Sequence, residues 1–201
     1  FTDEFGEPVF IIGAKNGTEQ IRNTYEKDDA GDWVKGRPTL KFTPMYNLRA
    51  TIKNRSLPII MVNSEREVDF LTEKLGSKYI FVCCDGGFGG SKDTDLKPIA
   101  DRNLFIITPP DHYGKIEAGH TAQLLLKLNA FIYSDLDFLI DLGIKDIIKF
   151  WETIEPLFNR FIEMSLEKPI NVQGRLRQDQ AARAFLFSKV GHPTNKGIIF
   201  L

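Results

Sequence analysis

The chain has 201 residues, of which 42% are hydrophobic and 26% are charged, a composition typical of a soluble globular protein. Its formal net charge of -1 excludes a general attraction to nucleic acid, so any such binding needs a local basic patch. No apolar run approaches the roughly 20 residues of a membrane span, so we expect no membrane partner. We interpret the start at Phe1, in place of methionine, as the mark of a piece of a longer protein.

Residues 1–56 are expected to form a small β-rich module. Pro8 to Ile12 has the pattern of a short strand, Asn16-Gly17 is a strong turn signal, and Thr39 to Phe42 is a further strand candidate. The stretch from Pro44 to Asn54 then predicts a short helix that ends before the first strand of the core.

Residues 57–135 are expected to form an α/β core. Three short apolar runs stop abruptly at polar or turn-forming residues, namely at Asn63, Asp85 and Pro110. Such runs are typical of strands buried on both faces of a parallel sheet. Between the first two runs, residues 64–76 have apolar side chains at helical spacing, which predicts a right-handed βαβ unit. Ligands of such sheets bind beyond the carboxyl ends of the strands, so we expect any chemistry there.

The remainder of the chain completes this core and then turns helical. Residues 114–128 predict a helix and residues 130–133 a fourth short strand, while residues 136–201 predict a helical C-terminal extension. The predicted fold class is therefore α/β, a central parallel sheet flanked by helices. The extension carries a basic cluster that consists of Lys168, Arg175, Arg177 and Arg183. This cluster either contacts nucleic-acid phosphate or, as is more common, belongs to a mixed-charge surface helix.

Two adjacent cysteines, Cys83 and Cys84, lie on a predicted buried strand. Because successive strand side chains point to opposite faces, a disulfide or a metal site between them is unfavourable. We expect both to be small core residues, and they fit a reducing, cytoplasmic location.

The segment from Asn63 to Glu67 has two interpretations. Glu65, at a strand-to-helix turn, is a candidate ligand for a divalent metal or a phosphate-bearing molecule. The alternative is structural: Ser64 caps the following helix, and Glu65 and Glu67 complement the positive end of the helix dipole. The residues alone favour the cap.

A second candidate is the glycine-rich run that follows Asp85. With Gly86 and Gly87 at its start, the run lets backbone N–H groups approach an anion, and Lys92 adds positive charge. The ending of a P-loop is absent, and a flexible connection between strand and helix is an equally good interpretation.

A third candidate is Asp111, which follows the third strand. An aspartate at this position is able to bind Mg²⁺ through carboxylate oxygen, although a solvated turn is the more common explanation for a single acid.

The order of elements and several local strings resemble the Toprim (topoisomerase–primase) domain of phage- and plasmid-type primases and primase–helicases. The resemblance covers roughly residues 5 to 150. The family's Tyr-x-Leu string compares with Tyr46-Asn47-Leu48, and its Val-Glu-Gly-Glu-Lys string compares with Val62-Asn63-Ser64-Glu65-Arg66, with Asp69 further along. Its Gly-Gly loop compares with Asp85-Gly86-Gly87, and its x-Pro-Leu string with Asp95-Leu96-Lys97-Pro98-Ile99. Its Pro-Asp-x-Asp string compares with the stretch from Arg102 through Gly114.

The departures from the family pattern fall on its acidic residues. The family's catalytic glutamate corresponds to Asn63, and its aspartate pair corresponds to the stretch from Pro110 to Tyr113. The resemblance implies Mg²⁺ held by clustered acids, and about two negative charges of that cluster are missing, so we expect Mg²⁺ to bind weakly or not at all. The leading hypothesis is a Toprim-like module of a DNA replication or mobile-element protein that has no catalytic activity.

This hypothesis implies DNA or RNA, or other domains or subunits of replication proteins, as partners. The first alternative keeps the enzyme: Glu65, Asp85 and Asp111 form a rearranged metal site, with Glu65 and Asp111 catalytic in primer synthesis or phosphoryl transfer. The second alternative is an α/β domain that binds a free nucleotide or another ligand at Gly86, Gly87 and Lys92.

Overall fold

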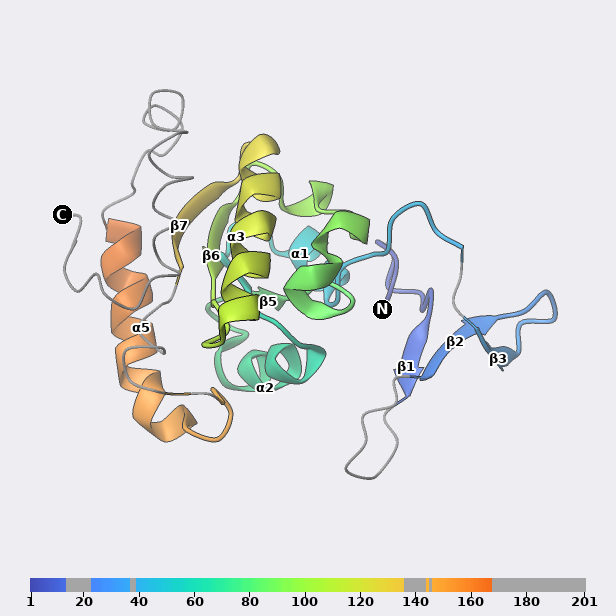
Figure 1. Cartoon of the computed structure of the whole chain (residues 1–201), viewed down its shortest axis with the longest axis horizontal. Coiled ribbons are helices and arrows are strands. Elements are labelled where there is room, and N and C mark those ends of the chain that lie inside the picture. Colours follow the sequence, from blue (N-terminus) through green and yellow to red (C-terminus); the bar gives the residue numbers. More distant parts are fainter. Residues whose placement is uncertain (14–22, 37–38, 136–143, 145, 168–201) are drawn as a thin grey trace.

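A computed structural model describes residues 1–13, 23–36, 39–135, 144 and 146–167 of the chain. Over these residues the protein is mixed α/β, as the sequence predicts. A three-stranded sheet at the N-terminal end lies beside a four-stranded parallel sheet that has helices on both faces (Figure 1).

The N-terminal sheet is antiparallel and consists of β1 (Ile11–Gly13), β2 (Asn23–Lys27) and β3 (Trp33–Lys35) in that order. The first strand begins later than predicted, because Pro8 only forms an isolated bridge with Thr2. The strand predicted at Thr39 to Phe42 is wrong. Leu40 and Phe42 are 40% and 46% exposed, so this stretch lacks the buried face that would hold a strand in a sheet. The turn predicted at Asn16-Gly17 lies outside the described residues.

The helix predicted at Pro44 to Asn54 is shorter in the structure, α1 (Leu48–Lys53). Asn47 precedes it in the left-handed conformation, with φ 65°. Its side-chain amide donates to the carbonyl of Phe81 at 3.0 Å, and the backbone N–H of Tyr46 donates to the carbonyl of Cys83 at 2.9 Å. The residues before α1 are therefore held against a strand of the core, which prevents them from entering the helix.

The core sheet has all four strands parallel, in the order β5-β4-β6-β7. The chain passes from β4 to β5 on one side and then crosses to β6 and β7 on the other. The topological switch point, where such folds bind ligands, therefore lies between the carboxyl ends of β4 and β6. The strands are β4 (Ile59–Met61), β5 (Ile80–Val82), β6 (Asn103–Ile106) and β7 (Phe131–Asp135).

Helices cover both faces of this sheet, and each face has its own apolar core. Helices α2 (Glu65–Leu75) and α5 (Trp151–Glu167) pack on one face. The other face carries α1 with α3 (His112–Lys127) and the 3₁₀ helices η1 (Gly87–Asp93) and η2 (Lys97–Ile99). Cys83 and Cys84 are buried in opposite cores, which confirms their predicted placement.

The C-terminal part of the described chain ends with α5, which contains Pro156. Trp151 and Phe158 on this helix belong to the same core as strand residues such as Phe105. The rest of the predicted helical extension, with the basic cluster at Lys168 and Arg175 to Arg183, lies outside the described residues. Among the helices that the structure describes, none has the length and apolar character needed to cross a membrane.

Candidate functional site at the carboxyl edge of the parallel sheet

A cleft of about 320 Å³ opens at the switch point between β4 and β6. Its walls come from the segments that follow these two strands, from the first turn of α2 and from the segment that precedes α5. The lining residues are Asn63, Glu67, Ile107, Thr108, Pro109, Pro110, Asp111, Ile144 and Ile147. The cleft therefore lies at the edge of the sheet where the sequence places any chemistry.

Asn63 links the end of β4 to the glycine-rich segment. Its side-chain oxygen accepts a hydrogen bond from the backbone N–H of Phe88 at 3.2 Å. Gly87 lies directly beside it, and a Cβ at this glycine would come within 2.5 Å of the Asn63 Oδ1. Gly87 also has φ +70°, a conformation that side chains with a Cβ rarely adopt. The close approach and the backbone conformation both require glycine here.

The glycine-rich run is a folded, packed connection over its described length. Gly87 N–H donates to the carbonyl of Cys84 at 3.0 Å, and Phe88 N–H donates to Asn63, so two amides of the predicted anion cradle are already bonded. Gly90 is pressed against the carbonyl of Asp85, and Gly89 faces the Glu117 side chain. Lys92 is exposed, and neither it nor Gly86 or Gly87 lines the cleft.

The start of α2 is a capping box, which confirms the structural interpretation of this segment. Ser64 Oγ accepts from the Glu67 N–H at 3.3 Å, and Glu67 Oε2 accepts from the Asn63 N–H at 3.1 Å and from the Ser64 hydroxyl at 3.0 Å. Burial raises the pKa of Glu67 above its ordinary value, while these hydrogen bonds act in the opposite direction. Our sequence reasoning did not place Glu67 at the site, although the Ser-x-x-Glu spacing carries the signal.

The raised pKa of Glu67 predicts a pH-dependent stability that Glu67→Gln removes. Because the folded-state pKa lies above the unfolded one, the stabilisation is present at low pH and is lost as the pH rises through the folded-state pKa. Glutamine still accepts both capping bonds but does not titrate. In urea unfolding over a pH series, we expect the wild-type stability to fall relative to the variant above the ordinary pKa of 4.5.

Glu67→Ala is the control for the cap itself, since it removes the acceptor at every pH. We expect it to lower the free energy of unfolding by about 1 kcal/mol below that of the glutamine variant across the series. Parallel stability curves for the wild type and Glu67→Gln would contradict the assignment of the titration to this carboxyl.

Asp111 is the N-cap of α3, where its Oδ1 accepts from the Gly114 N–H at 2.8 Å. A Cβ at Gly114 would lie within 2.5 Å of Pro109, so the turn after β6 is closely packed as well as capped. The exposed carboxylate of Asp111 still lines the cleft, opposite Asn63 and Glu67.

The other two predicted acids, Glu65 and Asp85, are not among the residues that line the cleft. Burial lowers the pKa of the Phe1 amino group, and the charges of Glu65 and Asp85 act in the opposite direction, so both carboxylates lie near that group. The cleft instead combines Asp111 with Glu67. Within the described ranges, no group of three or more His, Cys, Asp or Glu side chains is placed to hold a metal ion. The residues at this edge therefore do not fit the Mg²⁺ cage that the resemblance implies.

Comparison with known proteins does not assign the chain to a family. The chain matches no family model, no curated protein and no solved structure.

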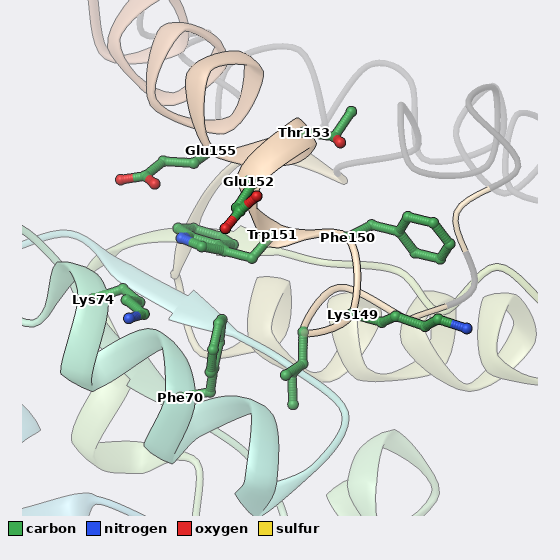
Figure 2. A pocket seen from close by; sticks show the side chains of 9 residues that line it. Phe70, Lys74, Lys149, Phe150, Trp151, Glu152, Thr153 and Glu155 are labelled. Carbon is green, nitrogen blue, oxygen red and sulfur yellow. The ribbon is translucent and has the colours of Figure 1, made fainter.

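A second hollow of about 500 Å³ lies between α2 and the beginning of α5 (Figure 2). The rings of Phe70 and Trp151 meet edge to face at 5.7 Å, and the Lys74 ammonium lies 5.7 Å from the Phe70 ring centre. The Trp151 indole N–H is buried and has no hydrogen-bond partner among the described residues. Glu152 and Glu155 border the same hollow, so lysines and glutamates offset each other and its charge selects no ligand class.

Proposed function

We propose that this chain is a Toprim-like module of a DNA replication or mobile-element protein, and that it binds DNA without catalysing phosphoryl transfer. The proposal rests on one observation: the polar side chains at the switch point are already hydrogen-bonded to the protein's own backbone. Asn63 stands where the family has its glutamate, and its oxygen holds the Phe88 N–H. Asp111 remains from the aspartate pair, and its oxygen holds the Gly114 N–H.

The chemistry of the cleft supports a non-catalytic role. A Mg²⁺-dependent phosphoryl transfer needs several carboxylates that neutralise and position the metal. Here two carboxylates remain, those of Glu67 and Asp111. Each is engaged as a helix cap, and the Glu67 pKa is raised, which reflects the penalty on its charged form. We therefore place the DNA contact elsewhere on the module, away from this acidic edge.

The alternative nucleotide site at the glycine-rich run has less support. An anion cradle needs several free N–H groups that converge on one point. The N–H groups of Gly87 and Phe88 are bonded inside the protein, so a phosphate would have to displace both bonds.

A metal titration tests the non-catalytic part of the proposal. We expect calorimetry and backbone NMR to give no saturable Mg²⁺ or Mn²⁺ binding at the cleft, and primer synthesis to be absent with either metal. Saturable binding that shifts the amides of Asn63 and Asp111, together with metal-dependent synthesis that Asp111→Ala abolishes, would overturn it.

Asn63→Asp is the matched variant for this titration. Aspartate has nearly the same shape and still accepts from the Phe88 N–H, but it adds a negative charge beside Glu67 and Asp111. We expect this variant to bind Mg²⁺ measurably more tightly than the wild type, because a hard cation prefers carboxylate oxygen. An unchanged affinity would show that the missing charge at residue 63 is not what limits metal binding.

A further inference from the structure

The N-terminal antiparallel sheet stands apart from the α/β core (Figure 1). Those of its side chains that the structure describes belong to neither apolar core. Trp33, Val34 and Ile11 are 37%, 39% and 40% exposed.

The strand register separates two faces of different chemistry. Tyr25 pairs with Ile11 on one side and with Lys35 on the other, and Lys27 pairs with Trp33. Because side chains alternate along a strand, these five residues share one face. The opposite face carries Glu26, which pairs with Val34. We name the first the aromatic–lysine face: Ile11, Tyr25, Lys27, Trp33 and Lys35.

The arrangement within the aromatic–lysine face is that of alternating rings and cations. Tyr25 and Trp33 are diagonal neighbours on adjacent strands, a spacing of about 7–8 Å. The Lys27 ammonium lies 5.6 Å from the Trp33 ring centre, which confirms that the two side chains share a face. Trp33, Lys27 and Lys35 are all exposed, and no carboxylate belongs to the described part of this face.

We infer that the aromatic–lysine face binds single-stranded DNA, with bases stacked on Trp33 and Tyr25 and phosphates contacted by Lys27 and Lys35. Aromatic rings stack on any base, and interleaved lysines follow the backbone, so such a face binds single strands with little sequence preference. A duplex hides its base faces and does not fit this mode. The choice of DNA rests on the proposed function, which this surface extends.

The tip of the hairpin between β2 and β3 carries three acids, Asp28, Asp29 and Asp32. Asp28 lies at the tip of the hairpin between β2 and β3, and its Oδ1 accepts from the N–H groups of Ala30 and Asp32 at 3.0 and 2.9 Å. Its carboxylate is thereby directed into the turn. Because the acidic tip repels phosphate, bound single-stranded DNA cannot extend far past Lys27 and Trp33. The site is therefore restricted to a few nucleotides.

Fluorescence anisotropy with a labelled oligo-dT of about 12 nucleotides tests the inference on the whole chain. We expect Trp33→Thr, which keeps strand propensity but removes the ring, to weaken binding about 10-fold. We expect the double variant Lys27→Gln/Lys35→Gln to reduce the slope of log affinity against log salt by about 1.4, or 0.7 for each phosphate that is no longer neutralised.

Val34→Thr is the matched control, since it makes the same kind of change on the same strand but on the opposite face. It should bind oligo-dT as the wild type does. Backbone NMR of β2 and β3 verifies that each variant keeps its sheet. If Trp33→Thr perturbs the sheet, Trp33→Phe replaces it as the test variant, and it should keep part of the wild-type affinity because it retains a ring. Wild-type binding that neither Trp33→Thr nor the lysine pair weakens would overturn this surface while leaving a DNA-binding function intact. No wild-type binding to oligo-dT would overturn the surface and the DNA-binding function together, whereas the non-catalytic assignment is decided by the metal titration.

Discussion

Replacing Gly90 by alanine is expected to lower the free energy of unfolding by about 3 kcal/mol, the upper part of the usual range for forced overpacking. A Cβ at this position collides with the carbonyl of Asp85, which is backbone and cannot swing away. The collision pushes η1 away from the end of β5. Urea unfolding followed by tryptophan fluorescence and circular dichroism measures the loss.

Gly86→Ala is the control in the same run, because a Cβ there meets no atom within 4 Å. Its φ of +84° leaves backbone strain as the only penalty, so we expect a loss of about 1 kcal/mol. If the Gly90 variant were as stable as the wild type, the packed geometry of this run would be wrong, and a flexible phosphate-binding loop would again be the better interpretation.

The prediction separates two roles for the same glycines. A loop that evolved to bind phosphate keeps glycine so that backbone N–H groups can reach a ligand. Here the close approaches of Gly87 to Asn63 and of Gly90 to Asp85 are approaches to the protein itself. Gly87 and Gly90 therefore let β5, η1 and the end of β4 pack together, which explains these two glycines without a ligand.

The core of the fold was predictable because its strands are buried on both faces. Runs such as Ile59 to Val62 are continuously apolar, and all of these residues are at most 1% exposed. The two cysteines and the Ser64 cap were predictable for a similar reason: each depends only on local alternation or on a three-residue spacing.

The composition of the cleft was not predictable in the same way. It depends on the strand order, which sets β4 beside β6 and brings Asn63 close to Asp111 across the switch point. It also depends on Ile144 and Ile147, which reach the site from a segment far along the chain. The sequence analysis assigned Glu65 a role at this edge, whereas Glu67, two residues further along and about 200° around the helix, lines the cleft instead.

The aromatic–lysine face shows a different limit. Tyr25, Lys27, Trp33 and Lys35 do not stand out in the sequence, where an acidic hairpin separates the two pairs. Only the antiparallel register places them side by side. Since the net charge of -1 is distributed over the whole chain, composition conceals a local basic surface of this size.

Phe158→Ala is expected to destabilise the protein by about 3–5 kcal/mol, the range for a large buried aromatic side chain. Phe158 is fully buried, and its ring meets those of Tyr79 and Trp151 edge to face at 6.4 and 5.7 Å. The contact with Tyr79 joins α5 to the segment between α2 and β5, whereas Trp151 belongs to α5 itself. If α5 is an integral layer, the variant should lower the stability of the whole core in one cooperative transition.

Leu157→Ala is the matched control, because the neighbouring side chain on the same helix is 44% exposed. It changes a similar apolar group without opening a cavity, so we expect a loss below about 1 kcal/mol. Hydrogen exchange at the amides of β4 and β6 then discriminates between two arrangements. Faster exchange in Phe158→Ala across the sheet means that α5 and the sheet unfold together. Faster exchange confined to α5 would mean that the helix is a separately stable appendage and that the α/β core is complete without it.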